Sequence, residues 1–246
     1  MKNRLDLLLV TRGLAASRTL AQALVMAGKV RVDGQVERKA SRQVGEEAVL
    51  EVEEPPRFVS RGGEKLEGAF AAFDGWRVDG LVCLDVGSST GGFTDCLLQH
   101  GALRVMAVDV GTNQLAYKLR SDPRVWVREN YNARFLSRAD LPETPEVAVT
   151  DVSFISLKLI LPPIVDVLAG GGEAVALVKP QFEVGRGNAP GGLVRDEKLR
   201  IEARDEIVRF ARDELKLELL GLAESPIRGR EMGNVEYLSY WRKPKE

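Results

Sequence analysis

Apolar and polar residues follow two different periods along the first 54 residues. Two helical stripes come first, with apolar residues Leu5, Leu8 and Leu9 in one and Leu20, Leu24 and Ala27 in the other. Ser17 stands where the N-cap of the second helix is expected, because its hydroxyl can accept a free backbone N–H of the first turn. Alternating residues then flank Asp33-Gly34, a dipeptide typical of hairpin turns, and residues 48–52 form one more apolar run. Residues 1–54 are therefore predicted to form a small α+β domain.

Strand-like apolar runs alternate with helical segments beyond residue 60. These runs are Leu81–Leu84, Val105–Val108, Val125–Val127, Val147–Thr150 and Ala174–Val178. Because helical segments follow most of them, they predict a mostly parallel sheet with helices on both faces. Near the end a charged helix over residues 197–216 precedes two strands joined by a short loop, which predicts a terminal antiparallel hairpin. Residues 60–246 are therefore predicted to form an α/β, Rossmann-like domain with a seven-stranded sheet.

Composition and length narrow the class of protein. The chain has 246 residues, 44% of them hydrophobic, which is enough for a sizeable core. Residues 55–59, which begin with Pro55-Pro56, are predicted to be a stiff linker between the two domains. No apolar run approaches the ~18 residues of a membrane span, and the N-terminus does not resemble a signal peptide. We therefore expect no membrane partner.

Cysteine and histidine usage bears on compartment and metal binding. The two cysteines, Cys83 and Cys96, lack CxxC spacing, and His100 is the only histidine. This pattern disfavours a disulfide framework, a cysteine zinc site and any site built from several histidines. We predict a cytoplasmic protein without a metal.

The N-terminal domain is basic, although the whole chain carries a net charge of −1. Residues 1–45 contain nine basic and three acidic residues, so their net charge is nine minus three, or +6. Such asymmetry favours a surface that binds a phosphate backbone. The candidate RNA-binding residues are Arg4, Arg12, Arg18, Lys29, Arg31 and, at the start of the second domain, Arg61.

The stretch "RLDLLLVTRGLAASRTLAQALVMAGKVRVDGQVERK" resembles the S4 RNA-binding domain. The features that match are "RLD" near the start, "SR" before the second helix and the alternating hairpin around Asp33-Gly34. This resemblance implies binding of structured RNA, which generally proceeds through phosphates and 2′-hydroxyls rather than through base sequence.

A glycine-rich loop, "DVGSSTGG", directly follows the first strand of the second domain. Ligands of open α/β sheets bind at this end of the strands, and Asp109, 22 residues after Gly87, suits a ribose diol. A dinucleotide fingerprint would need glycine at Ser89, so the loop favours S-adenosylmethionine (SAM) over NAD. The candidate cofactor-binding residues are Asp85, Gly87, Ser88, Ser89, Thr90, Gly91, Gly92, Asp109 and Asn132. Asn132 and Arg134 are candidates for adenosine contacts, with a structural turn as the alternative.

Four charged residues are predicted to meet near that loop. Asp151 and Lys179 follow neighbouring strands, Lys65 is placed just before the first helix of the domain, and Glu236 in the last hairpin strand. Charged residues directly after apolar parallel strands point into the ligand crevice.

The motifs "SRGGEKL", "DVGSSTGGFT", "DVSFIS", "LVKPQFEVG" and "GNVEY" resemble the TlyA family, FtsJ-like 2′-O-ribose methyltransferases with an N-terminal S4 domain. The resemblance implies a class I methyltransferase fold, SAM as cofactor, and a catalytic tetrad of Lys65, Asp151, Lys179 and Glu236. It further implies methylation of a cytidine ribose in ribosomal RNA on a ribosomal subunit. The chain looks like the shorter form of the family, which acts on the large subunit alone; small-subunit RNA is the less favoured substrate.

The chemistry requires a proton acceptor for the ribose hydroxyl. An ordinary lysine, with a pKa of ~10.4, is protonated at neutral pH, and desolvation or a second cation lowers that pKa. Our hypothesis is that Lys179 is the base, or at least the group that stabilises the developing alkoxide, with Lys65 lowering its pKa, Asp151 orienting it and Glu236 anchoring Lys65 or the ribose. The sequence leaves open which lysine is deprotonated.

Two alternative functions remain for the protein: a non-catalytic RNA-binding or ribosome-assembly factor, and a hemolysin, a label used within the family. The glycines of residues 182–196, after Lys179, predict a mobile loop able to close on RNA, with a disordered surface loop as the alternative.

Overall fold

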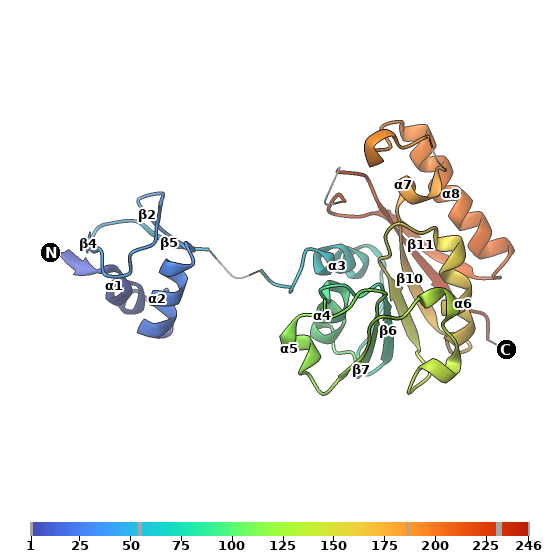
Figure 1. Cartoon of the computed structure of the whole chain (residues 1–246), viewed down its shortest axis with the longest axis horizontal. Coiled ribbons are helices and arrows are strands. Elements are labelled where there is room, and N and C mark those ends of the chain that lie inside the picture. Colours follow the sequence, from blue (N-terminus) through green and yellow to red (C-terminus); the bar gives the residue numbers. More distant parts are fainter. Residues whose placement is uncertain (1, 54–55, 186, 230–232, 246) are drawn as a thin grey trace. The chain divides into compact units, whose positions relative to one another are not determined.

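Two units make up the chain in the computed structural model, residues 1–57 and residues 58–246 (Figure 1). The structure describes residues 2–53, 56–185, 187–229 and 233–245. Of the predicted linker, Pro55 lies outside the described residues, as does Arg186 in the predicted mobile loop. Phe58 and Val59, which the sequence analysis put in the linker, instead pack in the core of the second unit.

The first unit combines two helices with short strands. Its elements are β1 (Lys2–Arg4), α1 (Leu5–Thr11), α2 (Arg18–Met26), β2 (Val30–Val32), β3 (Gln35–Glu37), β4 (Gln43–Gly45) and β5 (Leu50–Val52). Strands β3, β2 and β5 form one antiparallel sheet in that order, and β1 pairs with β4. Asp33 and Gly34 have φ of 52° and 79°, the left-handed turn that joins β2 and β3. The predicted hairpin is thus confirmed.

The helices of this unit correct one detail of the sequence analysis. Ser17 accepts the N–H of Leu20 at 3.2 Å, as predicted for the N-cap of α2. The predicted apolar stripe on α2 is right only in part: Leu24 packs against the core, but Leu20 is 44% exposed and Ala27 is exposed, while Ala21 and Val25 are fully buried. The buried face of α2 therefore centres on Ala21 and Val25 rather than on Leu20.

The second unit is a seven-stranded sheet with helices on both faces (Figure 1). Its strands are β6 (Val82–Val86), β7 (Arg104–Val108), β8 (Val125–Arg128), β9 (Val147–Thr150), β10 (Glu173–Val178), β11 (Glu218–Glu224) and β12 (Tyr237–Arg242). Its α-helices are α3 (Gly62–Ala72), α4 (Gly92–Gln99), α5 (Tyr117–Arg120), α6 (Leu161–Val167), α7 (Pro180–Glu183) and α8 (Glu197–Asp213). Short 3-10 turns lie at Ala133–Phe135, Arg138–Asp140, Leu157–Leu159 and Pro190–Gly192.

The strand order β11-β12-β10-β9-β6-β7-β8 places the switch in winding direction beside β6. The chain runs from β6 outward through β7 to β8 and then returns to the other side of β6 as β9. Such a switch opens a crevice at the carboxyl ends of the strands. The glycine loop follows β6 and therefore lies at this crevice.

The end of the chain forms the predicted antiparallel hairpin, with one refinement. Strand β12 pairs antiparallel with both β10 and β11, so it is inserted between them rather than added at the edge. Glu236 directly precedes β12, whereas the sequence analysis had put it inside that strand. Lys65 lies within α3 rather than before it.

Successive residues of the central strand face opposite layers. Val82, Leu84 and Val86 pack with α6 and α8, while Cys83 packs with α3 and α4. Asp85 shares the side of Cys83, and its carboxylate accepts a hydrogen bond from Thr94 in α4 at 2.6 Å. Full burial on both faces explains why these parallel strands appear in the sequence as continuous apolar runs.

Candidate active site

The structure brings together the four charged residues singled out from the sequence. Lys179 Nζ lies 2.6 Å from Asp151 Oδ1, and Lys65 Nζ lies 3.3 Å from Asp151 Oδ2 and 2.7 Å from Glu236 Oε2. These contacts form a continuous chain from Lys179 through Asp151 and Lys65 to Glu236. The four side chains come from α3 and from the ends of three neighbouring strands, β9, β10 and β12.

The four side chains of this series of ion pairs are largely buried, so burial and their mutual charges both affect their pKa values. The exposed fractions are 11% for Lys65, 18% for Asp151, 8% for Lys179 and 2% for Glu236. Burial alone would lower the pKa of Lys65, but the charges of Asp151 and Glu236 outweigh it and raise that pKa above its ordinary value. Lys65 is therefore held as an ammonium ion at neutral pH.

Ser153 is a site residue that the sequence analysis missed. Lys179 Nζ donates a hydrogen bond to Ser153 Oγ at 2.8 Å. Ser153 lies two residues after Asp151 in the same "DVSF" stretch, so its position after the strand was the signal that could have identified it. Asp151 and Ser153 together fix where the Lys179 amine lies.

A cavity of about 1230 Å³ opens above these residues. It is lined by the four charged side chains, by Gly87, Ser88, Ser89, Thr90 and Gly92 of the glycine loop, and by Ser60, Arg61, Ser153, Phe154 and Phe182, among others. The glycine loop and the charged chain therefore face one common space, large enough for a nucleoside-sized cofactor and part of a second ligand.

The backbone of the glycine loop is already committed to internal hydrogen bonds. The N–H groups of Gly87 and Ser88 donate to the carbonyl of Val108 at 2.8 and 3.3 Å, and that of Ser89 donates to the Asp109 carboxylate at 2.7 Å. A pyrophosphate-binding loop needs such N–H groups directed at the phosphates. The geometry thus agrees with the preference for SAM over a dinucleotide.

Two of the glycines have a packing requirement of their own. A Cβ on Gly91 would lie 2.3 Å from Leu119, and one on Gly92 would lie 2.4 Å from Ser60 Oγ and 2.7 Å from the N atom of Gly63. Gly92 thus permits the start of α4 to contact the start of α3. Their role in cofactor binding stays a prediction, since close helix contact alone accounts for both.

The acidic cofactor candidates occupy different environments. Asp109 is 8% exposed, and its oxygens accept N–H groups of Ser89 and Gly111, so they border the loop where a ribose is expected. Asp85 is fully buried, and burial is the main cause that raises its pKa to about 7. Asn132 caps a short turn by accepting the N–H of Arg134 at 3.1 Å, the structural role that was the alternative to an adenosine contact.

Two aromatic side chains stand at the mouth of the cavity. Phe154 is 81% exposed, and its ring centroid lies 5.2 Å from that of Phe182. Phe154 also has a φ of 63°, a left-handed conformation that is rare for an aromatic residue. The sequence analysis did not select either residue, because a single phenylalanine beside a motif resembles ordinary core.

The basic residues of the first unit have partners within that unit. Arg4 and Arg18 contact the fully buried Asp6 carboxylate at 2.9 and 3.1 Å. The hydrogen bond from Arg4 is the main cause that lowers the pKa of Asp6 well below its usual range. Partners of the other candidates are the Ala48 carbonyl for Arg12, Glu53 for Lys29 and the Gly34 carbonyl for Arg31. Arg18 remains 53% exposed, so its contact with Asp6 leaves much of the side chain accessible.

A doubly wound sheet with one inserted antiparallel strand, and with a cavity at its switch point, is the fold of Rossmann-like class I methyltransferases. Sequence comparison agrees. Residues 58–243 match the family described as FtsJ-like methyltransferase, and residues 3–50 match the S4 domain. The chain therefore belongs to the FtsJ-like methyltransferases and, because it is 46% identical to a protein named TlyA over 97% of its length, to the TlyA family within them.

Named relatives cover most of the chain. The 16S/23S rRNA (cytidine-2′-O)-methyltransferase TlyA of Mycobacterium tuberculosis is 46% identical over 97% of this chain and 89% of its own length. The 23S rRNA (cytidine-2′-O)-methyltransferase TlyA of Campylobacter jejuni is 39% identical over 76% of this chain and 71% of its own. A solved structure from Streptococcus thermophilus, named as a candidate hemolysin, is 44% identical over 99% of this chain and 89% of that chain, with a TM-score of 0.75. Among the described residues, no helix has the length and apolarity needed to cross a membrane.

Proposed function

We propose that this protein transfers a methyl group from SAM to the 2′-hydroxyl of a cytidine in ribosomal RNA, with large-subunit RNA as the favoured substrate. The observation that carries the proposal is the continuous chain of ion pairs from Lys179 to Glu236, facing the same cavity as the glycine loop. Both relatives named above are called cytidine-2′-O-methyltransferases, and 23S rRNA is common to their names.

The residues of the cavity suit SAM. The glycine loop would contact the cofactor without offering the N–H groups of Gly87, Ser88 and Ser89 to a phosphate, and Asp109, which borders this loop but is not among the residues lining the cavity, would hold the ribose hydroxyls. When bound, SAM supplies a methyl group that its sulfonium makes electrophilic. The complete set of four charged residues also favours an enzyme over a non-catalytic RNA-binding factor, because a buried chain of charges is costly to keep without a use.

Lys179 is the residue we assign as proton acceptor. Lys65 is unsuited to that role because two carboxylates raise its pKa, and it instead places a positive charge near the site at neutral pH. Lys179 Nζ, in its neutral amine form, would accept the proton of the ribose hydroxyl while that oxygen receives the methyl group that SAM supplies. Asp151 and Ser153 hold Nζ in place, so alignment supplies much of the rate enhancement.

The S4 unit and Arg61 would supply the RNA-binding surface. The first unit carries the excess of basic residues, and Arg61 lines the cavity. Phosphate contacts of this kind make binding fall steeply with salt, whereas SAM binding should respond to salt far less.

The test is methyl transfer from radiolabelled SAM to separate large and small ribosomal subunits that lack the modification. A 2′-O-methyl group blocks alkaline cleavage at its own phosphodiester, so the resistant position identifies both nucleotide and chemistry. We expect label on the large subunit with the wild-type protein, and none with Lys179→Ala or Lys179→Arg. Lys158→Ala is the matched surface control, since Lys158 pairs with Glu206 away from the cavity. Full activity of Lys179→Arg would contradict the base role, and SAM binding without label on either subunit would contradict the substrate assignment.

A further inference from the structure

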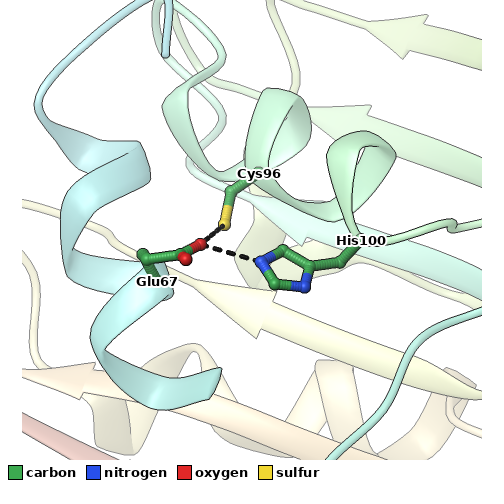
Figure 2. Close-up of side chains that lie close together, drawn as sticks. All are labelled: Glu67, Cys96 and His100. Carbon is green, nitrogen blue, oxygen red and sulfur yellow. Dashed lines mark hydrogen bonds and ion pairs between the residues drawn. The ribbon is translucent and has the colours of Figure 1, made fainter. Parts of the chain in front are cut away.

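A cluster of three chemically different side chains lies between helices α3 and α4, outside the cavity described above. Figure 2 shows Glu67 of α3 directed toward Cys96 of α4 and toward His100 at the end of that helix. Glu67 Oε2 lies 2.8 Å from His100 Nε2 and 3.7 Å from Cys96 Sγ. All three potential ligand atoms lie within 4.8 Å of one another.

The cluster is held by the packing of both helices. Cys96 and His100 are four residues apart, so they share one face of α4 and its end, and that face meets α3. The His100 ring stacks on Phe70 of α3 with 3.6 Å between centroids and 6° between planes. This stacking fixes the ring so that Nε2 points at Glu67. The positions of the three atoms are therefore set before any ligand arrives.

One sulfur, one imidazole nitrogen and one carboxylate oxygen form a set that suits a borderline divalent ion such as Zn²⁺. Ligand atoms bound tetrahedrally at ~2.0–2.3 Å from such an ion lie roughly 3.3–3.7 Å apart. The oxygen–sulfur separation already has this size, and the oxygen–nitrogen separation needs to open by about half an ångström. Cys96 is buried, whereas His100 and Glu67 are 28% and 31% exposed, so a water molecule can complete the coordination from outside.

We propose that Glu67, Cys96 and His100 form a zinc-class metal site that joins α3 to α4. The ion would replace the direct contact of Glu67 with His100 by three metal–ligand bonds, and its binding would release the thiol proton of Cys96.

The site would act on the helices that carry the proposed active site without contributing a group to it. Lys65 lies two residues before Glu67 on α3, and α4 begins at Gly92 of the glycine loop. A metal that fixes α3 against α4 would thus hold Lys65 relative to the loop. The sequence analysis predicted no metal because it counted cysteines and histidines separately; the mixed cluster exists only once α3 and α4 pack together.

The experiment uses the full chain without a histidine tag, stripped by a chelator and then titrated with Zn²⁺ in competition with a chromophoric chelator. We expect one ion per chain and an increase of several degrees in the unfolding temperature. Co²⁺ used in its place should give a near-ultraviolet thiolate charge-transfer band. Because His100 is the only histidine, its imidazole NMR signals form a single set, which should shift on addition of Zn²⁺.

The variants separate a built site from adventitious binding. Cys96→Ala, His100→Phe and Glu67→Gln should each weaken Zn²⁺ binding by about a hundredfold or more. The matched control is Cys83→Ala, because burial raises the pKa of the Cys83 thiol to about 12 and makes it a poor ligand. Thermal unfolding without metal shows whether each variant folds, and His100→Phe and Glu67→Gln keep the proposal testable if Cys96→Ala does not. Less than one ion per chain, or equal affinity in the Cys96, His100 and Cys83 variants, would overturn the proposal.

Discussion

The Lys65 ammonium lies 2.7 Å from the Glu236 carboxylate, which is almost completely buried. We expect Glu236→Gln to lower the free energy of unfolding by about 1.5–3 kcal/mol, because it removes the negative charge from a buried ion pair. The measurement is urea unfolding at neutral pH, with the exposed Glu224→Gln as control. Equal stability of both variants would show that the pair does not stabilise the fold.

The same pair has a defined dependence on pH. Since the pKa of Lys65 is raised in the folded protein, its contribution to stability is fully present below the unfolded value of ~10.4. The contribution is lost as the pH rises through the folded value. Glu236→Gln should therefore reduce the loss of stability that the wild-type protein shows above pH ~10, and unfolding curves at pH 9 and pH 11 would measure it.

The buried carboxyl of Asp85 should make the stability of the fold depend on pH below about pH 7. Burial raises the pKa of this carboxyl to about 7 in the folded protein, whereas the value in the unfolded chain is ~3.9. The folded state therefore binds the proton more tightly than the unfolded state does. Stability contributed by the protonated carboxyl is present below the unfolded pKa, declines as the pH rises, and is gone above about 7. The whole decline amounts to about 4 kcal/mol.

Asp85→Asn should flatten that decline, because the amide cannot ionise and still offers an oxygen to Thr94. The check is urea unfolding at half-unit steps from pH 4.5 to 8, with exposed Asp74→Asn as control. If the difference between wild type and Asp85→Asn does not change with pH, the carboxyl is not protonated in this range.

Much of the second unit could be predicted from local sequence. Parallel strands buried on both faces appear as continuous apolar runs, and each of the five predicted runs overlaps a strand from β6 to β10. The insertion of β12 between β10 and β11 could not be read this way, since pairing partners depend on tertiary packing rather than on a strand's own residues. The short strands β1 and β4 have no periodic pattern to detect over three residues each.

The candidate site, too, could be predicted from the sequence only in part. Lys65, Asp151, Lys179 and Glu236 could be selected because they stand in distinctive motifs, and the structure brings them together. Their order of contact could not be predicted, because it depends on how α3 lies against the strand ends. The stripe on α2 was right only in part for another reason: Leu20 and Ala21 both fit a helical period, and only the approach of α1 decides which is buried.

Gly92 provides a test of why the loop is rich in glycine. We expect Gly92→Ala to destabilise the protein by about 1–3 kcal/mol, because its Cβ would overlap the backbone N of Gly63 and the hydroxyl of Ser60. Neighbouring Gly62→Ala is the matched control, since its Cβ would come no closer than 3.4 Å to another atom. Unfolding without cofactor makes the comparison; equal stability would leave cofactor contact as the reason for Gly92.

Phe154 combines exposure, backbone strain and a position at the cavity mouth, which suggests a stacking surface for the target base. Aromatic stacking on an unpaired base contributes about 1–3 kcal/mol, so Phe154→Ala should lower kcat/KM for RNA by roughly ten- to a hundredfold. SAM affinity, measured by calorimetry, should not change, and Phe154→Tyr should retain activity. Phe154→Gly should also lose activity yet unfold at a higher urea concentration, because glycine accepts a φ of 63° without strain. A glycine variant that is both less stable and fully active would show that the strained aromatic residue serves the fold rather than the RNA.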